Sequence, residues 1–133
     1  MLTQPLWWRR RKRVVRRRRT SVTKHYLEHK ERARALVHER IAYWNQFYQF
    51  KFGRIAIRNQ RSCWGSCSEL GNLNFSYKIL FLPGHLADYI IVHELCHLQE
   101  FNHSKNFWAL VAKTMPKYRE YRKELRSTKL ALR

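Results

Sequence analysis

Apolar residues recur along this chain at two different periods, and the change of period predicts helices on both sides of a group of strands. In residues 27–50 the apolar side chains lie three and four positions apart, which is typical of one long amphipathic helix. The candidate core positions of this helix are Leu36, Ile41, Trp44 and either Phe47 or Tyr48.

Between residues 54 and 77 the pattern changes to alternation at period two, which is typical of strands with one buried face. Residues 54–58 are the clearest case, and residues 62–66 and 73–77 predict two further strands. A turn at positions 69–72, which contains Gly and Asn, joins the last two strands. We therefore expect a small, mainly antiparallel sheet.

Helical spacing returns in the second half of the chain. An apolar stripe continues from residue 86 to residue 98, and we expect a mostly buried helix there. Ser104 is a candidate N-cap for another helix over residues 105–112, and a short charged helix over residues 117–125 follows. Helices that flank a small sheet define an α+β domain.

The length and composition indicate one domain with short tails. The chain has 133 residues, of which 44% are hydrophobic, and five tryptophans can help to fill a modest core. We expect a disordered basic tail over residues 1–24, a folded domain over residues 25–127 and a C-terminal tail over residues 128–133. No apolar segment approaches the length of a membrane span.

Three cysteines without a secretion signal are typical of the reducing cytoplasm, where we expect this protein. Cys63 and Cys67 are four positions apart, so they do not form a C-x-x-C pair, and Cys96 lies within the predicted buried helix. We expect three small, mostly buried thiols; a second metal or redox site is the alternative.

The predicted buried helix contains the sequence H-E-x-x-H at positions 93–97, and a third histidine follows six positions later. Residues four positions apart share one helical face, so His93 and His97 can reach a single ion. His103 lies too far along to share that face, and the chain must turn back to bring it to the same site. A helix whose histidines line a solvated face is the alternative.

Three neutral histidine ligands leave one tetrahedral position open, which is the ligand set of a catalytic zinc site. We therefore predict Zn²⁺ bound by His93, His97 and His103. Glu94 lies one residue round the helix from His93, beside the metal but off its ligand face. A general base for metal-activated water belongs at that place.

The motif and its surroundings resemble the YgjP-like family of small bacterial zinc metallopeptidase domains, which are relatives of the SprT-like proteins. The residues that carry the resemblance are H-E-L-C-H at positions 93–97, Asn102-His103-Ser104, Phe107-Trp108, Trp64-Gly65-Ser66-Cys67, Gly71-Asn72-Leu73-Asn74 and Leu82-Pro83. The resemblance covers residues 26–125 and is most specific between residues 64 and 108. It implies an α+β zincin-like domain with the three histidines on zinc and Glu94 as the base.

Zincins commonly hold a peptide substrate as an added strand on a sheet edge beside the zinc helix. By the resemblance, the segment 64–67 is the candidate edge, with Trp64, Gly65 and Ser66 as substrate-binding residues. A packed strand and turn without this role is the alternative.

Peptide hydrolysis also needs a donor for the oxyanion besides zinc. Tyr118, Arg119 and Tyr121 are candidates on the last predicted helix, and the sequence does not select among them.

Two functions from different classes follow from these features. The first is a zinc-dependent metallopeptidase, a hydrolase acting on proteins or peptides, in which Glu94 takes the proton of zinc-activated water. The second is a nucleic-acid-binding or chaperone-like module with a catalytically silent zinc site. Glu94 favours the enzyme, because a structural zinc site does not need a carboxylate there.

The predicted N-terminal tail carries nine basic side chains and no acid in residues 9–19. They are Arg9, Arg10, Arg11, Lys12, Arg13, Arg16, Arg17, Arg18 and Arg19. These account for nine of the net charge of +19, so the rest of the chain is basic as well. Such a charge attracts nucleic acid, or an anionic membrane surface with Leu6, Trp7 and Trp8 as interfacial anchors. A solvated tail without a dedicated partner is the alternative.

If residues 9–19 bind polyanions, deleting residues 1–20 will flatten the salt dependence of binding to duplex DNA, RNA or anionic vesicles. Each phosphate contact releases counterions, so nine lost contacts would reduce the slope of log K against log salt by at most about 8. A variant with the nine basic residues replaced by Gln keeps the length and serves as the control. Identical slopes for the three proteins would show that the tail has no such partner.

Overall fold

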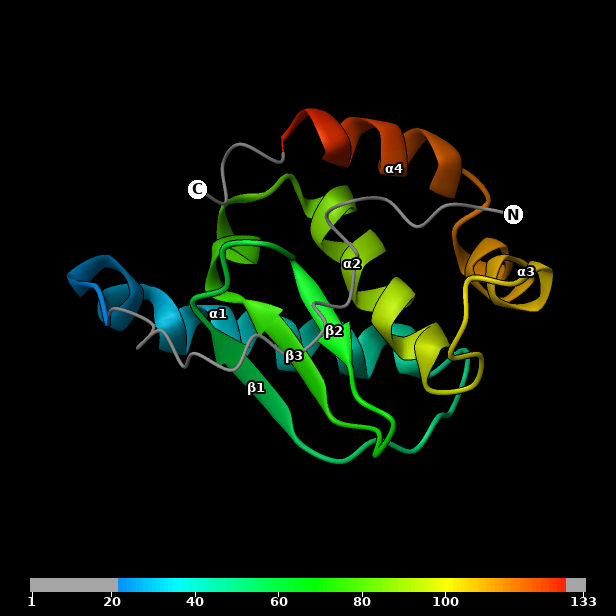
Figure 1. Cartoon of the computed structure of the whole chain (residues 1–133), viewed down its shortest axis with the longest axis horizontal. Helices are drawn as coiled ribbons and strands as arrows, with labels where there is room; N and C mark the ends of the chain where they lie inside the picture. Colours follow the sequence, from blue (N-terminus) through cyan, green and yellow to red (C-terminus); the bar gives the residue numbers. More distant parts are fainter. Residues whose placement is uncertain (1–21, 129–133) are drawn as a thin grey trace.

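The computed structural model describes residues 22–128 and contains a small sheet surrounded by helices (Figure 1). Its elements in chain order are α1 (Lys24–Asn45), β1 (Ile55–Arg58), β2 (Gly65–Cys67), β3 (Leu73–Ser76), the 3₁₀ helix η2 (Tyr77–Phe81), α2 (Gly84–His97), α3 (Lys105–Thr114) and α4 (Tyr118–Ser127). The predicted α+β class is confirmed. Residues 9–19, and with them the predicted polyanion-binding side chains, lie outside the described residues.

The sheet has the strand order β1-β3-β2 and is mixed, whereas the alternating pattern predicted a mainly antiparallel sheet. β2 and β3 form the predicted antiparallel pair, with Gly65 opposite Phe75, and the turn between them contains Gly71 at a positive φ of 83°. β1 pairs with the other side of β3 in parallel. The chain therefore crosses past β3 to reach β2, a connection that alternation alone cannot reveal.

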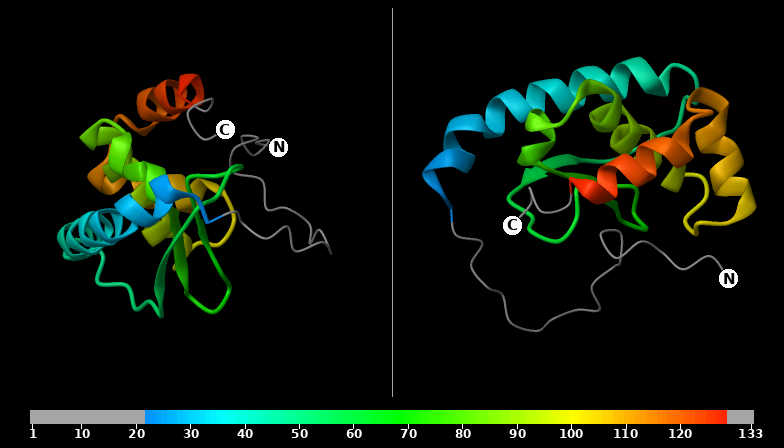
Figure 2. Two further views of the ribbon diagram at one scale, coloured as in Figure 1. Left: turned by 90° about the vertical axis from the view of Figure 1, so that its left-hand side faces the viewer. Right: turned by 90° about the horizontal axis from the view of Figure 1, so that it is seen from above.

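Side chains alternate across this sheet, and the buried set faces the helices. Leu73 and Phe75 of β3 and Ile57 of β1 are buried, whereas Asn74 between them is half-buried. The long helix α1 lies behind the sheet in Figure 1, and Figure 2 shows α1 and α4 on different sides of α2. α2 packs against β2, α1, α3 and α4, which makes it the central element of the fold.

α1 begins and ends earlier than predicted. The hydroxyl of Thr23 caps its start by accepting a hydrogen bond from the Tyr26 N–H at 3.1 Å, so α1 extends into the predicted tail. At its end, the Asn45 side chain bonds both backbone groups of Phe50, and Gln49 has a left-handed φ of 58°. A left-handed residue cannot continue a right-handed helix, so the prediction of helix to residue 50 was wrong.

The early end also changes which residues of α1 reach the core. Its buried residues are Ala33, Val37 and Ile41. Trp44 and Tyr48 pack partly against the core, but Phe47 remains 45% exposed. Of the predicted core positions, Leu36 is half-buried and Ile41 is correct.

The strands differ from their predicted bounds at the start of β1, at both ends of β2 and at the end of β3. β2 covers only Gly65–Cys67, where residues 62–66 were predicted. β3 stops at Ser76, because the Ser76 hydroxyl accepts a hydrogen bond from the Lys78 N–H and so starts η2. The short helix η2 was not predicted.

The helix α2 is buried along almost its whole length, as its apolar stripe predicts. A bidentate ion pair between Arg40 of α1 and Asp88 of α2, at 2.6 and 2.8 Å, joins these two helices. The predicted cap of α3 is confirmed, since Ser104 Oγ accepts a hydrogen bond from the Phe107 N–H. None of the helices in residues 22–128 is both long enough and apolar enough to cross a bilayer.

All three cysteines are free thiols. Cys96 is buried, which raises the pKa of its thiol to about 12, whereas Cys63 and Cys67 are half-buried. Within residues 22–128, the cluster of potential metal ligands contains histidine alone, so the cysteines do not contribute to it.

Candidate metal centre

Three histidine side chains from two parts of the chain converge at the C-terminal end of α2. The Nε2 atoms of His93 and His97 are 3.0 Å apart, and those atoms lie 3.0 and 3.1 Å from Nε2 of His103. His93 and His97 share the helix face that their spacing predicts, and the loop after α2 brings His103 back to them. Among the described residues, these are the three that could hold a metal ion together.

The hydrogen bond of its outer ring nitrogen determines which nitrogen of His97 carries the lone pair. His97 Nδ1 lies 3.1 Å from the carbonyl oxygen of Glu100, which can only accept, so Nδ1–H must be the donor. His97 Nε2 then carries a lone pair that faces the other two rings. His93 Nδ1 lies 3.1 Å from the Tyr89 hydroxyl, which can orient that ring in the same way.

The rings lie in a largely buried, aromatic environment that favours the uncharged form of His93 and His103. Phe107 contacts all three imidazoles, with ring centroids 4.3 to 5.0 Å apart, and Trp108 stacks on His103 at 5.8 Å. Burial lowers the pKa of His93 well below its usual value and that of His103 to about 3. Neutral imidazole is the form that binds a metal ion.

The residues fit a metal ion with tetrahedral geometry. Two nitrogen ligands of a tetrahedral zinc are about 3.3–3.4 Å apart when each Zn–N bond is about 2.0–2.1 Å, and the observed separations of 3.0–3.1 Å are close to this value. Three lone pairs directed at one point repel each other unless a cation lies between them. The buried donor set therefore has the chemistry of a cation site.

Glu94 lies on α2 beside the triad and against the edge strand β2. Its side chain is fully buried. A Cβ atom added to Gly65 would lie 2.8 Å from Glu94 Oε2 and 3.1 Å from the backbone oxygen of Asn74. A side chain at position 65 would displace the carboxylate and crowd the Asn74 oxygen, so glycine at this position lets the carboxylate lie this close to β2.

The predicted substrate-binding segment lies along one edge of the three-stranded sheet that residues 22–128 form. β2 pairs with β3 on one side, and it is the last strand in the order. Gly65 and Ser66 belong to β2, and Trp64 precedes it, with its carbonyl oxygen accepting a hydrogen bond from the Ser76 N–H at 2.8 Å. Gly65 and Ser66 therefore lie in an edge strand, as a substrate-binding role requires. Trp64 is only 1% exposed, as the alternative of a packed segment predicts.

Arg122 of α4 is a charged residue near the triad that the sequence analysis missed. Its guanidinium carbon lies 4.3 Å from the centroid of the Trp108 ring, and its buried Nε has no hydrogen-bond partner. Burial lowers its pKa, and its charge contributes to the lowered pKa values of His93 and His103. The guanidinium is therefore within electrostatic reach of the triad, and within residues 22–128 no acidic side chain pairs with it.

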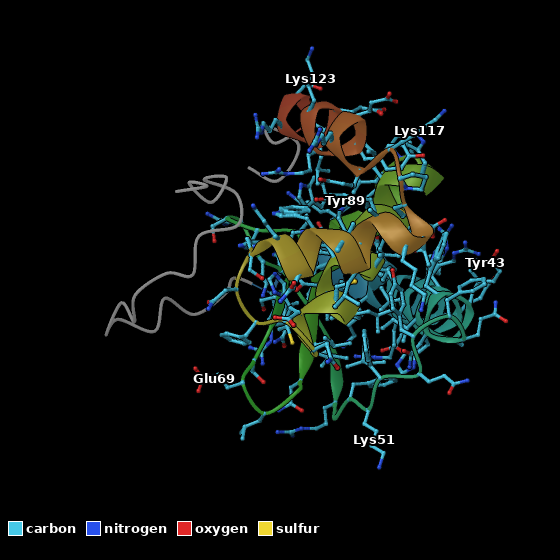
Figure 3. All side chains as sticks on the ribbon, turned by 90° about the vertical axis from the view of Figure 1, so that its right-hand side faces the viewer. Tyr43, Lys51, Glu69, Tyr89, Lys117 and Lys123 are labelled. Carbon is cyan, nitrogen blue, oxygen red and sulfur yellow. The ribbon has the colours of Figure 1, made fainter. Side chains whose placement is uncertain are left out.

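The three candidates considered for the oxyanion donor have other surroundings. Tyr118 stacks on Trp108 with the ring centroids 5.0 Å apart, and Arg119 is exposed and lies over the Tyr118 ring. Tyr121 approaches Tyr89, which Figure 3 shows in the region between α3 and α4. Arg122 belongs to the same predicted charged helix, but its spacing alone did not distinguish it from solvated neighbours.

Comparison with known proteins identifies the class of protein to which this site belongs. The model of the YgjP-like metallopeptidase domain matches residues 7–128, and the chain belongs to that family. The match begins inside the predicted basic tail. A comparison with curated proteins gives no significant match.

A solved structure supports the same fold. The chain is similar to the crystal structure of the metallopeptidase zymogen of Pyrococcus abyssi abylysin, with a TM-score of 0.64 and 22% sequence identity. The similarity covers 69% of this chain and 93% of that chain. At 22% identity the similarity supports the fold alone. The family match shows the class of protein: it is a metallopeptidase, a hydrolase of proteins or peptides.

Proposed function

We propose that this protein is a zinc-dependent peptidase in which His93, His97 and His103 hold the metal ion and Glu94 is the general base. The convergence of the three Nε2 atoms beside a buried glutamate is the observation that carries the proposal. Zinc is the expected ion because a three-histidine set with an open position suits catalytic zinc. When bound, zinc would polarise the scissile carbonyl and lower the pKa of coordinated water.

The residues of the chain supply the remaining steps. The peptide would lie along the edge of β2 that faces away from β3 and form main-chain hydrogen bonds there, with the scissile bond next to Gly65. Glu94 would accept a proton from the attacking water and deliver it to the nitrogen of the leaving amine. Its close packing against Gly65 holds the carboxylate at the strand edge, where both proton transfers must occur.

Arg122 is our candidate for stabilising the negative charge on the carbonyl oxygen. A half-buried guanidinium without an acidic partner is costly in the free protein, and an anionic group arriving at the site would offset this cost. The flat contact with Trp108 holds the side chain in one place. Such preorganised charge is effective because it does not need to rearrange during the reaction.

A module with a silent metal site remains the competing function, and the basic tail of residues 9–19 is the feature that favours it. In our proposal the tail brings the peptidase to substrates on nucleic acid or on an anionic membrane, and it has no part in the chemistry. Hydrolysis of short peptides would then not depend on the tail.

Glu94→Gln will retain the metal ion and lose peptide hydrolysis. The amide keeps the size of the side chain but cannot accept a proton, so we expect kcat to fall by about 10²- to 10⁴-fold. Metal content by atomic absorption and cleavage of casein and short peptides check this. Glu100→Gln, the same change close to the site, is the matched control, because the bond from His97 involves only the Glu100 backbone.

Equal activity of the wild type and Glu94→Gln would remove Glu94 as the base. A metal-loaded wild type without any activity would favour the silent module.

Arg122→Met will lower kcat by about 10²- to 10³-fold, with a smaller change in KM, if the guanidinium stabilises charge that develops during the reaction. Methionine keeps an apolar stem against Trp108, and Arg122→Lys keeps the charge without the planar contact. Lys123→Met removes a charge from the outer side of the same helix, where Figure 3 shows Lys123 pointing away from the protein, and should have no effect.

An unchanged kcat in Arg122→Met, at full metal content, would exclude this role.

A further inference from the structure

The third histidine of the triad is held in a different way from the first two. His93 and His97 belong to the buried helix α2, whereas His103 lies in the loop between α2 and α3, so its position depends on the side chains that pack against it. Trp108 of α3 is one of these. Its ring stacks on the His103 ring, with the centroids 5.8 Å apart and 25° between the planes, and it also meets His93 edge-on at 5.7 Å. Trp108 is only 8% exposed, so packing fixes the position of its ring.

The same tryptophan is the place where α4 packs against α3. Tyr118, the first residue of α4, stacks on Trp108 with the ring centroids 5.0 Å apart and 16° between the planes. Arg122 follows one helical turn later, and its guanidinium carbon lies 4.3 Å from the centroid of the Trp108 ring. One face of α4 therefore meets Trp108, and Trp108 contacts both α4 and the histidine triad.

The other contacts that hold α4 in place, within the described part of the chain, are modest. α4 has ten residues, which is too short for a stable helix in isolation, and Leu125 is its buried residue. The ion pair between Glu124 and His85 joins two side chains that are each 45% exposed, and such pairs contribute little. Tyr121 approaches Tyr89 only at 6.3 Å between ring centroids. A helix of this kind detaches at a lower free energy than the core, so its contact with Trp108 matters for docking.

The two residues of α4 that meet Trp108 differ in their effect on the triad. The charge of Arg122 contributes to the lowered pKa values of His93 and His103, which means that it disfavours positive charge at the triad. The ring of Tyr118 carries no charge, and its stacking on Trp108 does not oppose a cation there. The stacked ring is therefore the contact through which α4 can support a metal ion at the triad, and it is the contact to test.

We propose that Trp108 is a positioning residue for His103 and that, through Trp108, the docking of α4 and the binding of the metal ion favour each other. Such coupling is reciprocal: the factor by which docked α4 raises the affinity for the ion equals the factor by which the ion stabilises docked α4. Because α4 carries Arg122, the metal-loaded form is then the one that holds the guanidinium at the site. This coupling rests on the proposed function, since it takes the triad as the metal site.

The first test measures the zinc affinity of the full chain by competition with a chromophoric chelator. Tyr118→Ala removes the ring that stacks on Trp108 and should weaken zinc binding by about 3- to 10-fold, whereas Tyr118→Phe keeps the ring and should bind zinc as the wild type does. Tyr43→Ala is the matched control. Tyr43 is 45% exposed on α1 (Figure 3), and its ring meets Trp44 and Phe47, so its loss should not change the affinity.

A double-mutant cycle then tests whether Trp108 carries the coupling. Trp108→Leu should weaken zinc binding by about 10- to 100-fold, as the loss of a residue that orients a metal ligand does. In that background Tyr118→Ala should cause no further loss. Hydrogen exchange measures the reverse direction: zinc should slow the exchange of the α4 amides in the wild type, and much less in Tyr118→Ala. If Trp108→Leu does not fold, the two Tyr118 variants and the exchange experiment still decide.

The outcomes separate this coupling from the proposed function, because zinc affinity and peptide cleavage are measured independently. Equal zinc affinity in the wild type and Tyr118→Ala, an undiminished effect of Tyr118→Ala in the Trp108→Leu background, or exchange of α4 that zinc does not slow overturns the coupling. The peptidase proposal then stands if the wild type cleaves peptides. Coupling in a zinc-loaded wild type that cleaves no peptide supports the role of Trp108 and contradicts the proposed function. A wild type that binds no zinc overturns both.

Discussion

The convergence of three imidazole nitrogens at one point is the constraint on which the rest of this structure depends. The Nε2 atoms of His93, His97 and His103 lie 3.0–3.1 Å apart in an aromatic environment that disfavours protonation. A metal cation between the three nitrogens relieves their mutual repulsion better than a water molecule or a protonated imidazole does. Three neutral nitrogen ligands with one open position suit zinc. The carbonyl of Glu100 and the hydroxyl of Tyr89 bond the outer ring nitrogens, so both lie where they can keep the lone pairs directed inward.

The fold supplies the rigidity that this convergence requires. α2 is buried against β2, α1, α3 and α4, and the Arg40–Asp88 ion pair joins it to α1. Phe107 of α3 packs on all three histidine rings, so α3 closes the site that α2 begins. Gly65 brings the edge strand into contact with the carboxylate of Glu94. The histidine triad, the carboxylate and the strand edge are thus parts of one packed unit, and the proposed peptidase needs this proximity.

The sequence predicted those features that depend on local spacing. His93 and His97 face one site because they are four positions apart on a helix, and Ser104 caps α3 because its hydroxyl reaches the backbone three residues on. Features that depend on long-range packing were missed. The parallel pairing of β1 with β3 follows from the path of the chain, and the half-buried position of Arg122 follows from Trp108 beneath it. The early end of α1 was missed because Gln49 adopts a left-handed φ that its residue type rarely takes. Tyr89 could have been found, since it precedes His93 by one helical turn.

X-ray absorption spectroscopy at the zinc edge of the full-length, zinc-loaded protein tests the central claim most directly, because it measures the ligands of the ion without requiring a substrate. The account predicts three nitrogen ligands at about 2.0–2.1 Å with the multiple-scattering pattern of imidazole, and one oxygen ligand at the open position. Substitution of His103 by Ala should remove one imidazole, whereas substitution of His38, an exposed histidine of α1, should change nothing. A sulfur ligand at about 2.3 Å, or a spectrum that His103→Ala leaves unchanged, would contradict the three-histidine site.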